Sequence, residues 1–216
     1  MSQFKTIDQL IIKDTELVCR SQTRRSYQKA HFKQGDLDGA CGAYSIAMVL
    51  NILSVFDAEE LYSDNAIDKR TCEWKLIEAL HSYGLYRDGL TLEEVQVILH
   101  KYNRYIRTEE YDITHEESED VNYIRTNIDN NIPMIAGISY NKYDGHWVVI
   151  IGYSTDNKGN VENLLILDPG VNSPKVCCWN AMLSVKREKN KKYGYTYSSD
   201  NVNKVNLDEL VAVFPK

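Results

Sequence analysis

Cys41 is the residue of this chain best placed for covalent chemistry. It follows the loop Gln34-Gly-Asp-Leu-Asp-Gly-Ala and opens an apolar run, Gly-Ala-Tyr-Ser-Ile-Ala-Met-Val-Leu, whose spacing predicts a helix. A cysteine at a helix N-terminus faces unpaired backbone amides and the positive end of the helix dipole, and both favour thiolate over thiol. Because a thiolate can attack an acyl group, we expect Cys41 to be a nucleophile.

A histidine and an aspartate that could assist this cysteine lie in the second half of the chain. His146 stands in Gly145-His146-Trp147-Val-Val-Ile-Ile-Gly, at the start of a predicted strand, and Asp168 follows the apolar run Leu-Leu-Ile-Leu. Histidine can act as a general base, and a carboxylate can hold its ring in the required tautomer and orientation. The three side chains would together form a cysteine–histidine–aspartate triad.

The spacing of His146 and Asp168 predicts that they lie close together. If their strands pair as an antiparallel hairpin, Asn157, in the turn Asp156-Asn-Lys-Gly, is equidistant from both. Directly opposed residues of antiparallel strands share a face. The simplest register therefore puts Asp168 opposite His146, and a bulge would shift the pairing by one residue.

Further candidates flank the nucleophile and the histidine. Gln34 precedes Cys41 by seven positions, so its side-chain amide could turn back and stabilise an oxyanion beside the thiol. Flanking residues with little bulk, or with an aromatic ring, could contact a substrate. The expected substrate contacts are Gly39, Gly42, Gly145 and Trp147.

Each of these residues also has a purely structural interpretation. A lone cysteine before a helix is more often a small buried hydrophobe, and Asp-Pro-Gly is ordinarily a turn. The triad candidates and the glutamine occur in order, each on the element that its role requires, which favours a catalytic site. The weaker histidine candidates are His31, His81, His100 and His115. Of the other cysteines, Cys19 and Cys72 are expected to be packing residues, and Cys177 and Cys178 to lie on alternate faces of a strand.

The apolar periodicity changes from helical to strand-like along the chain. Helical patterns fall at about residues 41–56, 71–82, 91–102 and 119–130, and Thr91-Leu-Glu-Glu94 has the pattern of a capping box. Strand-like runs fall at 133–139, 146–153, 163–168, 174–179 and 202–214, with shorter extended segments in 7–20. Residues 107–117 are expected to be a connector or edge strand, and 193–200 a polar loop. Helices followed by strands predict an α+β fold with segregated elements.

Length and composition indicate one ordinary globular domain. The 216 residues are expected to form a helical half at about 34–130 and a sheet half at about 131–216, with 43% hydrophobic and 26% charged residues. Five cysteines without regular spacing argue against a disulfide framework, and no Cys-x-x-Cys or histidine cluster indicates a metal, so we expect no metal and no cofactor.

Charge and hydropathy bound the partners and the compartment. The net charge is −6, and the one basic run, at residues 186–192, is expected to be a solvated loop, so we expect no nucleic-acid partner. The N-terminus lacks a signal-peptide pattern, and no apolar stretch reaches the roughly 18 residues of a membrane span. We expect a cytoplasmic protein with no membrane partner, with export by a signal-independent route left open. The oligomeric state stays open.

These motifs resemble those of the papain-like cysteine peptidases. Within that group the chain is most similar to the bacteriocin-processing peptidases, which remove double-glycine leaders, and to their stand-alone relatives. The resemblance rests on the Gln34…Cys41 helix start, the Pro-Met-Ile-Ala-Gly strand, the strand that carries His146, and Ile-Leu-Asp168-Pro-Gly. It implies a helical lobe carrying the cysteine, packed on an antiparallel sheet carrying the histidine and acid.

The resemblance also implies the roles of the site residues. Cys41 would be the nucleophile, His146 the general base and acid, Asp168 the orienting acid, and Gln34 the oxyanion donor. The expected function is hydrolysis of a peptide or protein substrate through a thioester acyl-enzyme. The alternatives are another acyl transfer, such as deamidation or transamidation of a protein glutamine or ligation of peptides, and a non-enzymatic binding domain on the same scaffold.

Overall fold

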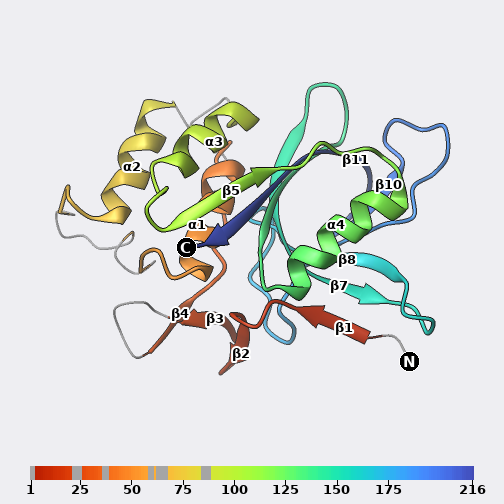
Figure 1. Ribbon diagram of the computed structural model, residues 1–216, viewed down its shortest axis with the longest axis horizontal. Coiled ribbons are helices and arrows are strands. Elements are labelled where there is room, and N and C mark those ends of the chain that lie inside the picture. The colour runs from red at the N-terminus through yellow and green to blue at the C-terminus, as the bar shows by residue number, and fades with distance from the viewer. Residues whose placement is uncertain (1–2, 21–25, 36–38, 58–60, 62–67, 84–88) are drawn as a thin grey trace.

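The computed structural model describes residues 3–20, 26–35, 39–57, 61, 68–83 and 89–216. The helices within these residues are α1 (Cys41–Ile52), α2 (Cys72–Ser82), α3 (Leu92–His100) and α4 (Glu117–Asp129) (Figure 1). The predicted helices are thus confirmed, although α1 ends four residues earlier than expected. The capping box at Thr91 and Glu94 is also confirmed, with both of its reciprocal hydrogen bonds formed.

The main sheet of the described chain is antiparallel throughout and closes on itself. Its strands are β6 (Met134–Ser139), β7 (Gly145–Thr155), β8 (Val161–Leu167), β9 (Ala181–Ser184), β10 (Tyr195–Ser198) and β11 (Val202–Pro215). The pairings run from β7 through β6, β11, β10, β9 and β8 back to β7. Two further strands, β1 (Gln3–Thr6) and β5 (Ile106–Glu110), extend β7 and β11. The strands β2 (Ile11–Lys13), β3 (Glu16–Arg20) and β4 (Tyr27–Lys29) form a separate small sheet.

The expected α+β fold with an antiparallel sheet is confirmed, but its elements are less segregated along the chain than expected. The edge strand expected within 107–117 is present as β5, in the half that otherwise holds the helices, and β1 joins the main sheet from the N-terminus. The helices do not form one lobe either: α1 packs against β6, β7 and α3, whereas α4 packs against β1 and β7, away from α2 and α3 (Figure 1). Long strands leave edges that distant segments can pair with, so the order of elements along the chain does not decide the layers.

Two expectations for individual segments are also wrong. Residues 174–179 form no strand: Val176 is 90% exposed, whereas Cys178 and Trp179 pack against the core from irregular backbone. The expected polar loop at 193–200 instead contains β10, in which Tyr195 and Tyr197 are buried and paired with β11. Alternating tyrosines suit a half-buried strand, and their hydroxyl groups had suggested a loop.

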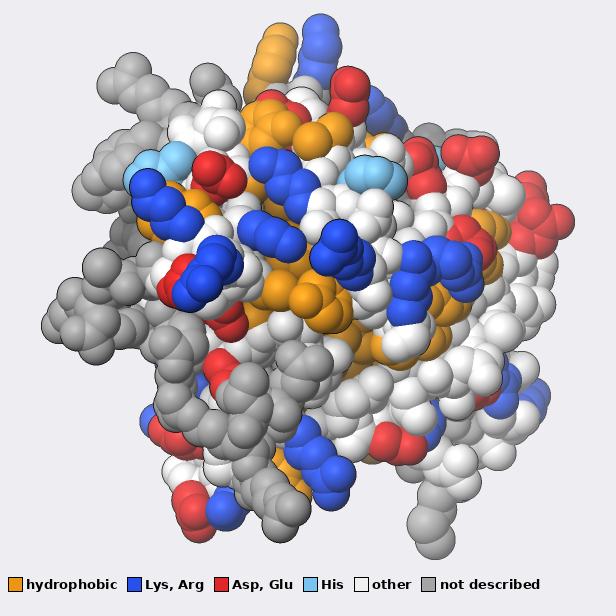
Figure 2. All heavy atoms as spheres, turned by 60° about the vertical axis from the view of Figure 1, so that its left-hand side comes forward, with side chains coloured by type: hydrophobic (Ala, Val, Ile, Leu, Met, Phe, Trp, Pro, Cys, Tyr) orange, Lys and Arg blue, Asp and Glu red, His pale blue; other side chains and the backbone are white. Residues whose placement is uncertain are grey.

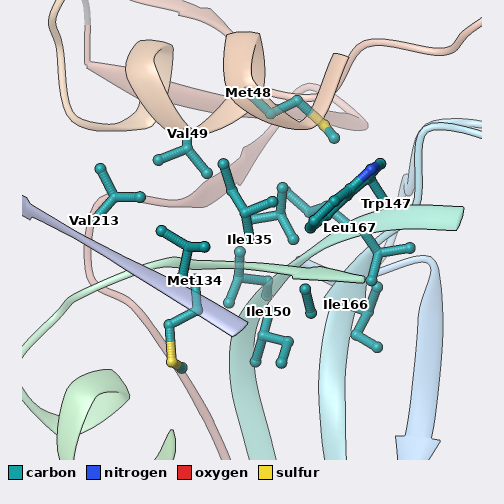
Figure 3. Packing of buried hydrophobic residues seen from close by; sticks show 14 of the residues in the cluster. Met48, Val49, Met134, Ile135, Trp147, Ile150, Ile166, Leu167 and Val213 are labelled. Atoms are coloured by element: carbon teal, nitrogen blue, oxygen red, sulfur yellow. The ribbon is translucent and has the colours of Figure 1, made fainter. Parts of the chain in front are cut away.

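Helix α1 is buried in the centre of the molecule. All of its residues except Tyr44 are buried. In Figure 3 its Met48 and Val49 face Ile135, Trp147 and other side chains of the sheet. Fully burying an aliphatic side chain stabilises a fold by about 1.5–3 kcal/mol, so this contact strongly constrains where the helix, and the residue at its start, can lie.

The surface beside the helices carries mixed charge. On the face in Figure 2, Lys and Arg side chains gather near the middle, Asp and Glu lie mostly around them, and hydrophobic side chains lie between. No described helix combines the length and apolar character that a membrane crossing requires.

Strand β1 approaches β7 too closely for a side chain at Gly152. Thr6 pairs with Gly152, and a Cβ atom added to this glycine would lie 2.3 Å from the carbonyl oxygen of Lys5. Because backbone is harder to displace than a side-chain tip, only glycine fits here.

We therefore expect Gly152→Ala to lower the free energy of unfolding by about 1–3 kcal/mol through overpacking. Urea unfolding followed by circular dichroism measures this. Gly145→Ala is the matched control, because its added Cβ would lie 3.7 Å from its nearest neighbour, the Ile138 carbonyl oxygen. Equal unfolding midpoints for Gly152→Ala and the wild type would contradict the close approach of β1.

Candidate active site

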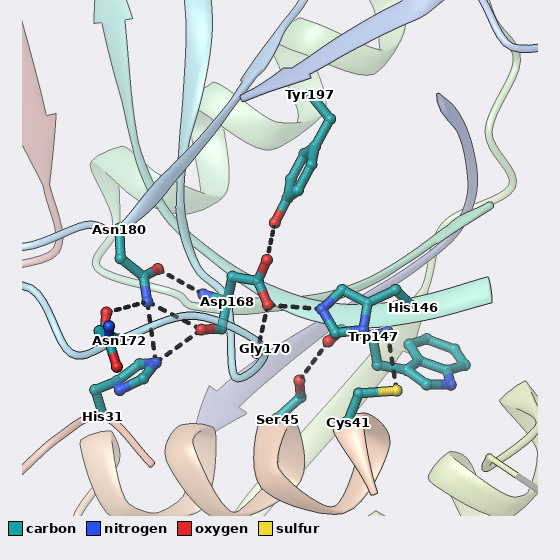
Figure 4. A network of polar contacts seen from close by, with 10 residues as sticks. All are labelled: His31, Cys41, Ser45, His146, Trp147, Asp168, Gly170, Asn172, Asn180 and Tyr197. Atoms are coloured by element: carbon teal, nitrogen blue, oxygen red, sulfur yellow. Dashed lines mark hydrogen bonds and ion pairs between the residues drawn. The ribbon is translucent and has the colours of Figure 1, made fainter. Parts of the chain in front are cut away.

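Cys41 is the first residue of α1, and its thiol meets strand β7. The residue is 8% exposed, and the preceding residue, Ala40, offers no side-chain cap for the amides of the first helical turn. The backbone N–H of Trp147 donates to Cys41 Sγ at 3.4 Å (Figure 4). The thiol thus lies beside the strand that carries His146.

Trp147 joins the two sides of the site through three hydrogen bonds. Besides its bond to Cys41, its carbonyl accepts from Ser45 Oγ at 3.1 Å and its indole N–H donates to the Leu90 carbonyl at 2.6 Å. Gly42 leaves room for this packing, because a Cβ there would lie 3.1 Å from both Leu90 and the indole ring. Gly42 is therefore buried behind the thiol.

His146 and Asp168 are in direct contact, with His146 Nε2 2.6 Å from Asp168 Oδ1. Their predicted direct opposition is wrong. Val149 pairs with Leu167, so continuing this register would place residue 148 opposite Asp168. The shift is two residues, and because side chains alternate with a period of two, the pair still shares a face.

The turn of the hairpin explains the shift. Thr155 pairs with Val161, so the turn is centred at Lys158, one residue later than predicted. Asp156 Oδ1 accepts hydrogen bonds from the N–H groups of both Lys158 and Asn160, which extends the loop to Asn160. Two bulges between this turn and the site offset each other.

The carboxylate of Asp168 has partners on both oxygens. Tyr197 donates its hydroxyl hydrogen to Oδ2 at 2.6 Å, and the N–H of Gly170 donates to Oδ1 at 2.6 Å, beside His146. In Figure 4 Tyr197 reaches one carboxylate oxygen from above, and His146 lies to the right, beside the other oxygen. A buried carboxylate with these donors stays ionised and keeps one orientation.

The backbone of Asp168 is also held by side chains. Asn180 Oδ1 accepts from the Asp168 N–H at 2.7 Å, and Asn180 Nδ2 donates to the Asp168 carbonyl at 2.9 Å. His31, which is fully buried, places Nε2 2.8 Å from the same carbonyl and Nδ1 2.8 Å from Ser173 Oγ. Sequence reasoning missed Asn180 and Tyr197 and ranked His31 low, because no local pattern links them to Asp168.

Gln34 lies beside the acid loop. Its backbone N–H donates to the Pro169 carbonyl at 2.9 Å, and its Oε1 is buried without a hydrogen-bond partner in the described chain. Residues 36–38, in the loop between Gln34 and Cys41, lie outside the described residues.

A cavity of about 540 Å³ opens over the thiol. Its walls are the start of α1, the segment before α3, the β6–β7 hairpin and a bend in β11. Three of the four expected substrate contacts line it, namely Gly39, Gly145 and Trp147, and Gly42 does not. Tyr143, which is 86% exposed, lines it too. No group of three or more His, Cys, Asp or Glu side chains in the described chain could hold a metal ion.

The model of the Peptidase_C39 like family matches residues 20–201. The chain belongs to this family. It is therefore a C39-like cysteine peptidase.

Two solved structures resemble this peptidase at low identity. UfSP from C. elegans aligns with the whole chain at 14% identity and a TM-score of 0.47, although the chain covers 34% of that protein's chain. The peptidase domain of Streptococcus ComA, a bi-functional ABC transporter involved in a quorum sensing pathway, has 17% identity and a TM-score of 0.38. That alignment covers 85% of this chain and 95% of the domain's chain. The peptidase matches no curated protein.

Electrostatics in the peptidase favour a thiolate–imidazolium pair. Burial lowers the pKa of His146, but hydrogen bonds and charge from Asp168 and Cys41 outweigh burial and raise this pKa to about 9. Burial also acts to raise the pKa of Cys41, yet His146 and the N–H groups of Trp147 and Gly42 bring it below the ordinary thiol value. For Asp168, burial opposes ionisation, and the bonds from His146, Tyr197 and Gly170 still lower its pKa.

These shifts predict the pH dependence of thiol alkylation. Cys41 should react with iodoacetamide at pH 7. The midpoint of its rate against pH should lie below the ordinary thiol pKa of about 8.5, because the imidazolium persists up to about pH 9. In His146→Ala only burial and the backbone donors remain, so the midpoint should rise. Mass spectrometry of the labelled peptides measures both rates, with Cys72 as internal reference. An unchanged Cys41 profile in His146→Ala would rule out the ion pair.

Tyr197→Phe should lower the free energy of unfolding at pH 7 by about 2 kcal/mol, because a buried carboxylate loses a hydrogen bond. The lowered pKa of Asp168 stabilises the fold above its unfolded value of about 3.9, so the difference from wild type should shrink as the pH falls below 4. Tyr153→Phe is the control: Tyr153 bonds Asp129, whose side chain is 46% exposed, so its loss should cost under about 1 kcal/mol. Equal losses in the two variants at pH 7 would contradict this.

Proposed function

We propose that the peptidase hydrolyses a peptide bond of a peptide or protein through a thioester on Cys41. The observation that carries the proposal is the arrangement of Cys41, His146 and Asp168 below the cavity. The His146 ring lies between a thiol whose pKa is lowered and a carboxylate held in one orientation, as an activated nucleophile requires.

The reaction follows from the protonation states of these groups. The Cys41 thiolate attacks the carbonyl carbon, a C–S bond forms, and the carbonyl π electrons move onto oxygen. When the tetrahedral intermediate collapses, the C–N bond breaks and His146 donates its proton to the leaving amine. Neutral His146 then takes a proton from water, whose oxygen attacks the thioester, and the C–S bond breaks to return the thiolate–imidazolium pair.

The oxyanion is proposed to lie at the start of α1. The amide of Cys41 is one candidate donor, because the first intrahelical bond of α1 runs from the N–H of Tyr44 to Ala40 and the earlier amides have no intrahelical acceptor. The side-chain amide of Gln34 is the second, supported by the attachment of its backbone to the acid loop.

A digest of a complex peptide mixture tests this function. Mass spectrometry should detect new N-termini with the wild type and none with Cys41→Ala, and Gln34→Ala should lower the rate by about 10²-fold or more, the effect of removing one oxyanion donor. Cys72→Ala is a matched control, because Cys72 also begins a helix and should leave cleavage unchanged.

Other outcomes would redirect or overturn the proposal. A mass increase of about one unit at glutamine, without new N-termini, would assign deamidation instead of hydrolysis. New N-termini that persist in Cys41→Ala would remove Cys41 from the mechanism.

A further inference from the structure

We propose that Glu209 makes the peptidase select substrates with a lysine or arginine side chain close to the scissile bond. This inference rests on the peptidase activity proposed above. It concerns the wall of the active-site cavity that β11 forms, where both Asp208 and Glu209 line the space.

The sheet brings Glu209 to the same face as the catalytic strand. Glu209 pairs with Gly137 of β6, and Gly137 pairs with Trp147 of β7, so the three residues form one row across neighbouring strands. Directly opposed residues share a face. Two strand spacings separate Glu209 from Trp147, roughly 10 Å between backbones, and the Trp147 amide contacts the Cys41 thiol.

A bulge and a glycine direct the carboxylate toward the cavity. The β11–β6 register shifts between Leu207 and Glu209, which leaves Asp208 without a partner on β6 and re-aims the next side chain. The carboxylate then lies over Gly137, with Oε2 2.0 Å from the position that a Cβ of this glycine would occupy. A side chain at residue 137 would displace the carboxylate from this position, so Gly137 leaves that space to Glu209.

The carboxylate of Glu209 has no hydrogen bond and no ion pair within the part of the chain that the structure describes, although it is only partly exposed. The neighbouring acids differ: Asp208 accepts a hydrogen bond from Asn206 at 2.7 Å, and Asp144 accepts one from Asn141. Burial, followed by the charges of Asp208 and Glu110, raises the pKa of Glu209.

The charges of the cavity wall fit a cationic group. Among its described residues, the wall carries the carboxylates of Asp144, Asp208 and Glu209 and the ammonium of Lys142, whose Nζ lies 5.5 Å from the Tyr143 ring centroid. A desolvated carboxylate without a donor gains most from a ligand that brings both charge and N–H groups. Lysine and arginine side chains do so at the end of a long stem, which suits a carboxylate about two strands from the thiol.

Peptide cleavage tests the preference directly. New N-termini from the mixture should show lysine or arginine enriched within three positions of the cleaved bond. For a peptide built on such a site, Glu209→Gln should lower kcat/KM about 10- to 100-fold, the effect of losing a charge-assisted hydrogen bond. The norleucine analogue should change less than about threefold. The matched control, Glu162→Gln, removes an exposed carboxylate of β8 outside the cavity and should affect neither peptide.

Thiol modification provides a second readout that needs no cleavage. Two methanethiosulfonate reagents of similar size, one bearing trimethylammonium and one bearing sulfonate, form a mixed disulfide with Cys41 and release methanesulfinate. The ratio of cationic to anionic rates at Cys41 should fall several-fold in Glu209→Gln at low salt, and the difference should shrink at 1 M salt. Glu162→Gln should retain the wild-type ratio.

The two readouts separate the possible failures. If the wild type cleaves no peptide, the peptidase function fails, while the reagent ratio still decides whether Glu209 attracts cations to Cys41. Cleavage sites without basic enrichment, or basic enrichment that survives in Glu209→Gln, would overturn the role of Glu209. A reagent ratio that is the same in wild type and Glu209→Gln would do so as well.

Discussion

The contact between the first turn of α1 and strand β7 is the interaction on which the rest of the site depends. Burial of α1 against β6 and β7 provides most of the free energy that holds the helix on the sheet. The hydrogen bonds of Trp147 then favour one alignment of helix and strand. Since His146 directly precedes Trp147 in the chain, a helix aligned with Trp147 is also aligned with His146. Much of the geometry around Cys41 is thus a consequence of core packing.

The position of Asp168 is constrained in a different way. Asp168 lies just beyond β8, where no ladder bonds hold it, and its position depends on side chains from distant segments: His31 before α1, Asn180 before β9 and Tyr197 in β10. A buried charge is costly unless it is fully hydrogen-bonded, so these partners make the ionised carboxylate tolerable and give it one orientation. His146 then gains its raised pKa from a fixed charge. The same sheet carries Glu209 on the row next to that of His146, so the proposed selection of charged substrates depends on the same strand pairing.

What could be predicted from the sequence was local. The start of α1 at Cys41 and the capping box at Thr91 follow from residues within a turn of each other, and both are present. The hairpin register was missed by two residues. An Asx-type loop and bulges change the energy of a hairpin only slightly, and apolar periodicity gives no sign of them. Strand β10 was missed because its tyrosine-rich sequence resembles a polar loop. Only the pairing with β9 and β11, distant in the chain, shows that it is a strand.

The sequence by itself determined which residues could do chemistry and on which elements they lie, because helix starts, strand runs and turns depend on neighbours in the chain. Only the tertiary structure decided which side chains meet. The contacts of Asp168 with Tyr197 and Asn180, the burial of Gly42 behind the thiol, and the approach of Glu209 to Gly137 all join segments far apart in sequence. Such contacts are set by packing of the whole core and by the need to hydrogen-bond buried polar groups. Neither produces a periodic pattern in the amino-acid sequence.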